Sequence, residues 1–214
     1  MCAAEARPPF CLEGLELTGV PSAQPAGVVA RIVTGTTVLR IMPFHGKATA
    51  TGAALTPFGF TNLPGPGRFS EASENRLAWA AGNCWHLISP HPALVLEQEL
   101  KQVLAGLAAV SSAGGGFLRL RISGTAACAL MAKGCVLDLD RFVPGRSAVS
   151  LMAHTKIHLH RCADAEFDLL IPASHAASFW EWLTMSAAEF GLAVQTTAAA
   201  VLEDGAPLPA ALSA

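Results

Sequence analysis

The chain has 214 residues, of which 52% are hydrophobic and 14% are charged, and its formal net charge is −2. This length supplies one large hydrophobic core or two small ones. Lysines and arginines occur singly, which argues against nucleic-acid binding because that function needs a basic face. The charged fraction is below the roughly 25% usual in globular proteins. Such sparse charge is equally compatible with burial in an assembly and with a simple alanine-rich composition.

The first 70 residues predict an edge segment, a hairpin and a long loop. Residues 1–26 contain several prolines and little periodicity, so we expect a poorly structured N-terminal segment. Residues 27–42 alternate on either side of Gly35-Thr36, which is typical of a β-hairpin. Residues 43–70 are dense in Gly, Pro and Thr and are expected to be mostly loop.

The next stretch predicts a strand pair and a helix. Two short strands are expected over 77–88, around Gly82-Asn83. After Pro92, which suits the first turn of a helix, apolar residues recur at helical spacing from Ala93 to Leu107. A glycine run at 114–116 ends this unit.

A strand over 117–122 and a short helix over 125–133 are predicted next. Ser123 is a plausible N-cap for this helix, and Gly134 stands where a left-handed C-terminal cap is expected. In this interpretation Lys133 and Gly134 have structural roles, and Cys135 has no chemical one.

Residues 138–145 are expected to be loop, followed by strands over 148–152, 156–161 and 167–171. A last helix is predicted over 174–190, with Gly191 ending it. Its apolar stripe consists of Ala176, Phe179, Trp180, Leu183, Ala187 and Phe190.

The predicted fold class is α+β: a mostly antiparallel sheet backed by three helices. We expect a single α+β domain over residues 27–196, preceded by the segment 1–26 and followed by a C-terminal tail over 197–214.

Histidines and cysteines offer two candidate sites. His158, His160 and Cys162 alternate on a predicted strand, with His154 just upstream, and together they form a possible zinc-ligand set. The sequence shows no clear fourth ligand beyond the nearby Asp164, so a half-exposed strand face is the favoured interpretation and no metal site is predicted.

The Lys133-Gly134-Cys135 segment is the second candidate. A nearby ammonium lowers the pKa of a thiol, whereas the C-terminal end of a helix raises it, and the two effects oppose each other here. We therefore predict no catalytic residue. Phosphate-loop, dinucleotide-binding and nucleophile-elbow motifs do not occur either, so no cofactor site is predicted in this chain.

Trp182 lies off the apolar stripe of the last helix, and Met185 and Ser178 share its side. A tryptophan there belongs either to a second core layer or to a contact with another chain, because interfaces favour Trp and Met. Both interpretations remain open from the sequence.

The sequence gives no sign of a membrane span, since the apolar stretch from Val103 to Val110 soon reaches a Ser/Gly-rich run. Glu5 and Arg7 precede any apolar run, so no signal peptide is expected and we predict a cytoplasmic location. The six cysteines (2, 11, 84, 128, 135 and 162) form no Cys-x-x-Cys pair and predict free thiols.

Several segments together resemble the gamma subunit of heterotetrameric sarcosine oxidase over about residues 60–191. They are LPGPGR (63–68), CWHLISP (84–90), RISGTAACALMAKGCVLDL (121–139), FVPG (142–145), LHR (159–161), FDLLIPASHAASFWEWL (167–183) and AAEFG (187–191). Thr125 departs from the pattern, which often has proline there.

The resemblance implies a fold similar to the folate-binding domain of the glycine-cleavage aminomethyltransferase. It implies a bacterial accessory chain whose alpha, beta and delta partners carry FAD, FMN, NAD, tetrahydrofolate and zinc. Three functions stay open: a non-catalytic subunit of an amine oxidoreductase complex, acting on sarcosine, N-methylglutamate or another secondary amine; a stand-alone folate-binding one-carbon protein; and a zinc-binding module. For the second, Arg121 and Asp138 are the candidate pterin contacts.

Overall fold

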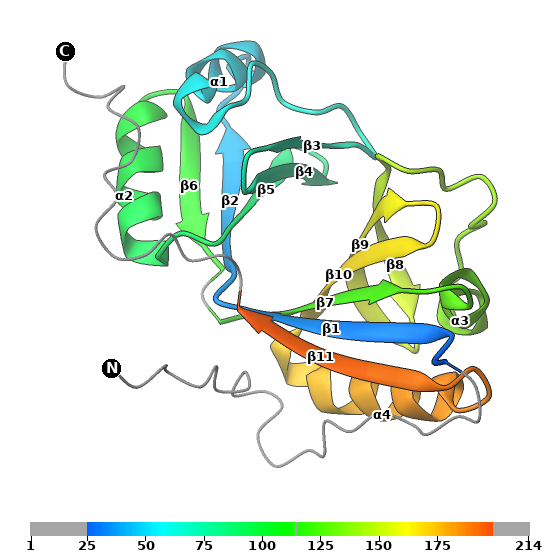
Figure 1. The fold of residues 1–214 in the computed structure, drawn as a ribbon. Helices are drawn as coiled ribbons and strands as arrows, with labels where there is room; N and C mark the ends of the chain where they lie inside the picture. The colour runs from blue at the N-terminus through cyan, green and yellow to red at the C-terminus, as the bar shows by residue number, and fades with distance from the viewer. Residues whose placement is uncertain (1–24, 114, 199–214) are drawn as a thin grey trace, which may run out of the picture. The chain divides into compact units, whose positions relative to one another are not determined.

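The computed structural model describes residues 25–113 and 115–198 (Figure 1). They form two compact units. Unit 1 contains the described residues of 25–34, 67–69 and 115–197, and unit 2 contains 35–66, 70–113 and residue 198. The N-terminal segment and C-terminal tail expected at 1–26 and 197–214 lie almost wholly outside the described residues, and the single domain expected over 27–196 stays a prediction.

Unit 1 is built on a six-stranded sheet with the order β11-β1-β7-β10-β9-β8. The strands are β1 (Val28–Thr34), β7 (Phe117–Ser123), β8 (Ser147–Met152), β9 (Thr155–Ala163), β10 (Glu166–Pro172) and β11 (Leu192–Ala198). The pairs β1–β7, β7–β10, β10–β9 and β9–β8 are antiparallel. Alternation places every second residue of each strand on the same face of this sheet.

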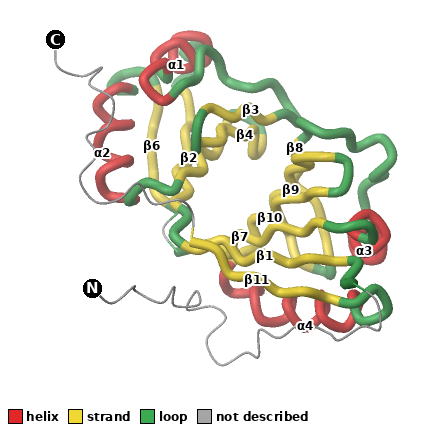
Figure 2. Tube along the Cα trace, in the orientation of Figure 1, coloured by secondary structure: helices red, strands yellow, loops and turns green. Residues whose placement is uncertain are grey.

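Two helices cover one face of the unit 1 sheet. They are α3 (Ala127–Gly134) and α4 (Ala176–Ala187), the latter preceded by a 3-10 turn, Ala173–His175. Figure 2 shows α4 running along this sheet. The core between them includes Ile32, Leu120, Leu169, Leu130, Phe179 and Leu183. The predicted stripe of the last helix is confirmed at Ala176, Phe179, Trp180, Leu183 and Ala187, whereas Phe190 is half-buried.

Unit 2 is built on a five-stranded sheet with the order β3-β4-β5-β2-β6. The strands are β2 (Thr37–Pro43), β3 (Phe69–Ala72), β4 (Asn75–Ala81), β5 (Cys84–Ser89) and β6 (Ala108–Ser112). The helices are α1 (Ala48–Ala54), a 3-10 turn (Thr56–Phe58) and α2 (Ala93–Val103). Leu96 and Leu100 on the predicted apolar face of α2, together with Leu104 directly after the helix, join Leu39, Ile41 and Leu87 in a separate core.

The predicted hairpin over 27–42 is wrong in its pairing. Both strands form, but β1 pairs with β7 and β2 pairs with β5 and β6, so they belong to different sheets. Gly35, at φ 71°, makes the turn between them. Local alternation indicates a strand and its buried face, but the partner strand is selected by long-range packing that a two-residue period does not encode.

Four further elements differ from the sequence expectation. The predicted loop over 43–70 contains α1, whose sequence ATATGAA has no apolar stripe. A Cβ on Gly52 would lie 2.7 Å from the backbone nitrogen of Leu63. The glycine therefore allows the helix to pack closely against the backbone of the following loop. The strands β3, β6 and β11 were not predicted: β3 begins inside the expected loop, β6 follows a helix of similar composition, and β11 lies at the expected domain end.

The α+β class is confirmed: two mostly antiparallel sheets are accompanied by four α-helices in the described part of the chain. Among these residues, no helix combines the length and the apolar character that crossing a membrane requires.

Candidate functional site

The segment Lys133-Gly134-Cys135 ends α3 and lies against α4. The Lys133 ammonium donates a hydrogen bond to the Ser186 carbonyl at 2.7 Å, pairs with the Glu189 carboxylate, and lies 4.7 Å from the centre of the Phe190 ring. The lysine therefore joins the two helices. The half-buried Cys135 thiol lies 4.0 Å from the Ser150 hydroxyl. A serine hydroxyl is not a general base that could deprotonate the thiol.

Both predicted caps of this helix are wrong. The N-cap position is Ala126, without a side-chain cap hydrogen bond, and Ser123 is the last residue of β7. Gly134 is the last helical residue and has no positive φ, and the chain continues into an extended Cys135. A Cβ on Gly134 would lie 2.4 Å from Cζ2 of Trp182. The glycine is therefore required by a tryptophan ring and not by a left-handed turn.

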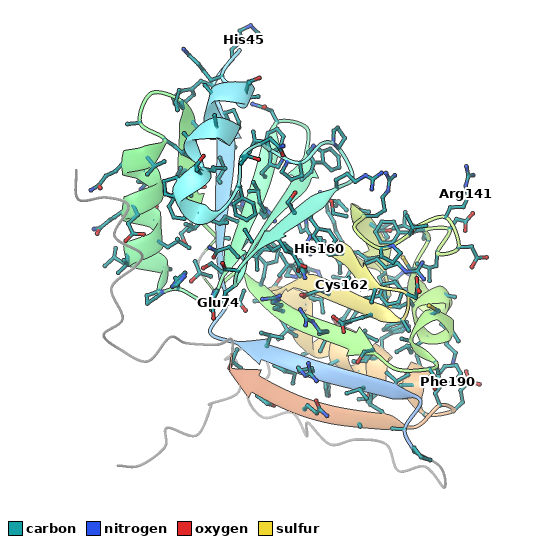
Figure 3. The ribbon with its side chains drawn as sticks, turned by 45° about the horizontal axis from the view of Figure 1, so that its top comes forward. His45, Glu74, Arg141, His160, Cys162 and Phe190 are labelled. Carbon is teal, nitrogen blue, oxygen red and sulfur yellow. The ribbon has the colours of Figure 1, made fainter. Side chains whose placement is uncertain are left out.

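The histidine candidates lie on β9. His158 and His160 share the sheet face opposite the helices, where the His158 ring meets Phe117 edge-on at 5.6 Å and the His160 ring lies 5.5 Å from Phe69. Figure 3 marks His160 and Cys162 on this strand. His154 lies in the β8–β9 turn. No group of three or more His, Cys, Asp or Glu residues with a metal-binding arrangement occurs in the described ranges.

The same sheet face contains an ion network that was missed from the sequence. The Asp168 carboxylate, whose side chain is 1% exposed, accepts hydrogen bonds from Arg119 at 2.7 Å and from Arg121 at 3.0 Å. Arg121 also pairs with Glu166 at 3.4 Å. Burial disfavours the charged guanidinium, but the Asp168 and Glu166 carboxylates outweigh it and raise the pKa of Arg121 above its ordinary value.

A sequence signal for this network existed. In FLRLRIS and EFDLLIP, charged residues occupy alternate positions of strands whose other positions are apolar, so they share one face. The register of β10 on β7, which places Asp168 opposite Arg121, could not be predicted from the two-residue alternation along each strand.

The proposed pterin contacts have separate partners. Arg121 is engaged with Asp168 and Glu166, whereas the Asp138 carboxylate accepts hydrogen bonds from the backbone N–H groups of Asp140 and Arg141 within its own loop. Among the described contacts, none joins Arg121 to Asp138. The two candidate side chains are therefore engaged in separate contacts within the chain.

Residues of the recognised segments have structural roles. The Arg161 guanidinium donates to the carbonyls of Leu139 at 2.6 Å, Phe142 at 2.7 Å and Asp164 at 2.6 Å, which fixes the loop over 138–145. In unit 2, the Trp85 indole N–H donates to the Pro64 carbonyl at 2.8 Å and holds the LPGPGR loop.

The described cysteines, Cys84, Cys128, Cys135 and Cys162, are free thiols as predicted, and Cys2 and Cys11 lie outside the described residues. Burial raises the pKa of the Cys84 thiol, against a smaller opposing effect of Arg40. A raised pKa leaves this thiol protonated and less nucleophilic at neutral pH.

Trp182 both packs on the core and faces a groove. Its ring lies 5.4 Å from that of Phe179 and packs against the unit 1 core, which supports the second-core-layer interpretation. The residue also lines a groove of about 260 Å³, which we call the Trp182 groove. It is lined by Lys133, Gly134, Val136, Leu151, Ala153, His154 and Trp182.

Known proteins provide an independent comparison. The model of the sarcosine oxidase, gamma subunit family matches residues 48–189, about two thirds of the chain. No curated protein sequence matches.

Two solved structures share the fold. A chain of heterotetrameric sarcosine oxidase from Corynebacterium sp. U-96, in complex with pyrrole 2-carboxylate, matches with a TM-score of 0.68 and 23% identity, over 76% of this chain and 85% of that chain. Glycine cleavage system aminomethyltransferase T from Bartonella henselae matches with a TM-score of 0.60 and 14% identity, over 79% of this chain and 48% of that chain. At these identities the likeness shows the fold alone.

Proposed function

Because the chain belongs to the sarcosine oxidase gamma subunit family, we propose that it is an accessory, non-catalytic subunit of its oxidoreductase complex. The complex oxidatively demethylates or dehydrogenates a secondary amino acid, with sarcosine as the first candidate and N-methylglutamate as the second. The family match over residues 48–189 is the observation on which this proposal depends.

The contacts of the family-like segments support a bracing role. Arg161 fixes one loop through backbone carbonyls, Trp85 holds another, and Gly134 gives room to the Trp182 ring. The polar side-chain groups of Arg161 and Trp85 are thus bonded within the chain, and Gly134 serves packing. A subunit built in this way stabilises its neighbours by presenting a fixed surface.

The partners follow from the family. We propose alpha, beta and delta subunits in the cytoplasm, with FAD, FMN, NAD, tetrahydrofolate and zinc held by those subunits and not by this chain. The solved structure that shares the fold is described as heterotetrameric, which supports the presence of other chains.

Co-expression tests this function. The tagged chain, produced together with the proposed alpha, beta and delta subunits, should co-purify with larger yellow partners and oxidise sarcosine. Omitting this chain should lower the yield or stability of the complex. A colourless monomer that leaves the flavin-bearing subunits behind, with those subunits fully active and stable alone, would contradict the proposal.

Cys135→Ser tests the non-catalytic assignment within that complex. Since the described contact of the thiol is the Ser150 hydroxyl, the variant should keep nearly wild-type turnover. A loss of about 100-fold with the fold intact, a size typical of a catalytic group, would place chemistry at this residue.

A stand-alone folate-binding protein is the second candidate, supported by the fold shared with the aminomethyltransferase. Isothermal titration of the purified chain with a reduced folate decides it. Tight binding by the folded, isolated chain would favour this candidate over the accessory role.

A further inference from the structure

We draw no further inference here: the strongest candidate, the Trp182 groove that the end of α3, the β8–β9 turn and α4 line in unit 1, is an apolar surface patch, and nothing in the structure shows what covers it.

Discussion

The two faces of the six-stranded sheet in unit 1 are stabilised by different interactions. On the face covered by α3 and α4, Phe167 and Leu169 of β10 belong to the hydrophobic core. Between them, on the opposite face, Asp168 is equally buried and is bonded to Arg119 and Arg121. Successive residues of one strand thus contribute to stability by apolar packing and by ion pairing. The comparison predicts different responses to substitution at neighbouring positions.

The largest effect is expected on the ionic face. Asp168→Asn keeps the side-chain shape but removes the charge that two guanidinium groups share. Since a buried pair that loses one partner leaves an uncompensated charge, the free energy of unfolding should fall by about 3–5 kcal/mol. Urea denaturation of the full chain measures this loss of stability.

The matched control for Asp168→Asn is Arg119→Met combined with Asp168→Leu. Replacing a buried ion pair with apolar residues is often neutral, so this double variant should recover most of the lost stability. A double variant as unstable as Asp168→Asn would show that Arg119 is not the main partner.

The core face is expected to respond by a different mechanism. Leu169→Ala removes a fully buried side chain beside Asp168 and leaves a cavity among the residues packed under α4. The free energy of unfolding should fall by about 3 kcal/mol. This loss should be independent of salt concentration. A loss under 1 kcal/mol would mean that the helices close the cavity by moving.

The helices on the core face give a smaller, steric prediction. Gly134→Ala places a methyl group 2.4 Å from the Trp182 ring as the structure stands, so the ring or the end of α3 must shift. Overpacking of this kind costs about 1–3 kcal/mol. Gly115→Ala is the control, because a Cβ there meets no atom within 4 Å and the residue has no positive φ. Tryptophan fluorescence should change in the first variant only.

Sequence periodicity predicted the elements of the core face well. The apolar positions of α4 and the strands β7, β9 and β10 are confirmed because burial of one face imposes a 3.6- or two-residue period on the sequence itself. The pairing of β1 with β7 was missed because it joins residues about 90 positions apart, and no local pattern records such a contact.

The site was only partly predictable, for a related reason. Trp182 was identified because it departs from the period of its helix. Gly134 was identified as necessary but for the wrong reason, since its neighbour Trp182 comes from another helix. Asp168 was missed entirely: an alternating charge predicts an exposed face, and only the register across β10 and β7 shows that the charges neutralise one another.

The smallest effect is expected at the edge of the ionic face. Arg31 of β1 lies in register with Arg121, and its guanidinium donates two hydrogen bonds to the Gln195 side-chain oxygen, at 3.1 and 3.2 Å. These bonds are exposed to solvent, so water replaces them when they are lost. Arg31→Ala should therefore change the free energy of unfolding by less than about 0.5 kcal/mol.

Arg119→Ala is the informative comparison, since that guanidinium also donates to one partner but is buried beside Asp168. If the two variants lose equal stability, burial does not determine how much the polar contacts on this face stabilise the fold. The distinction between the two faces of the sheet then loses its physical basis.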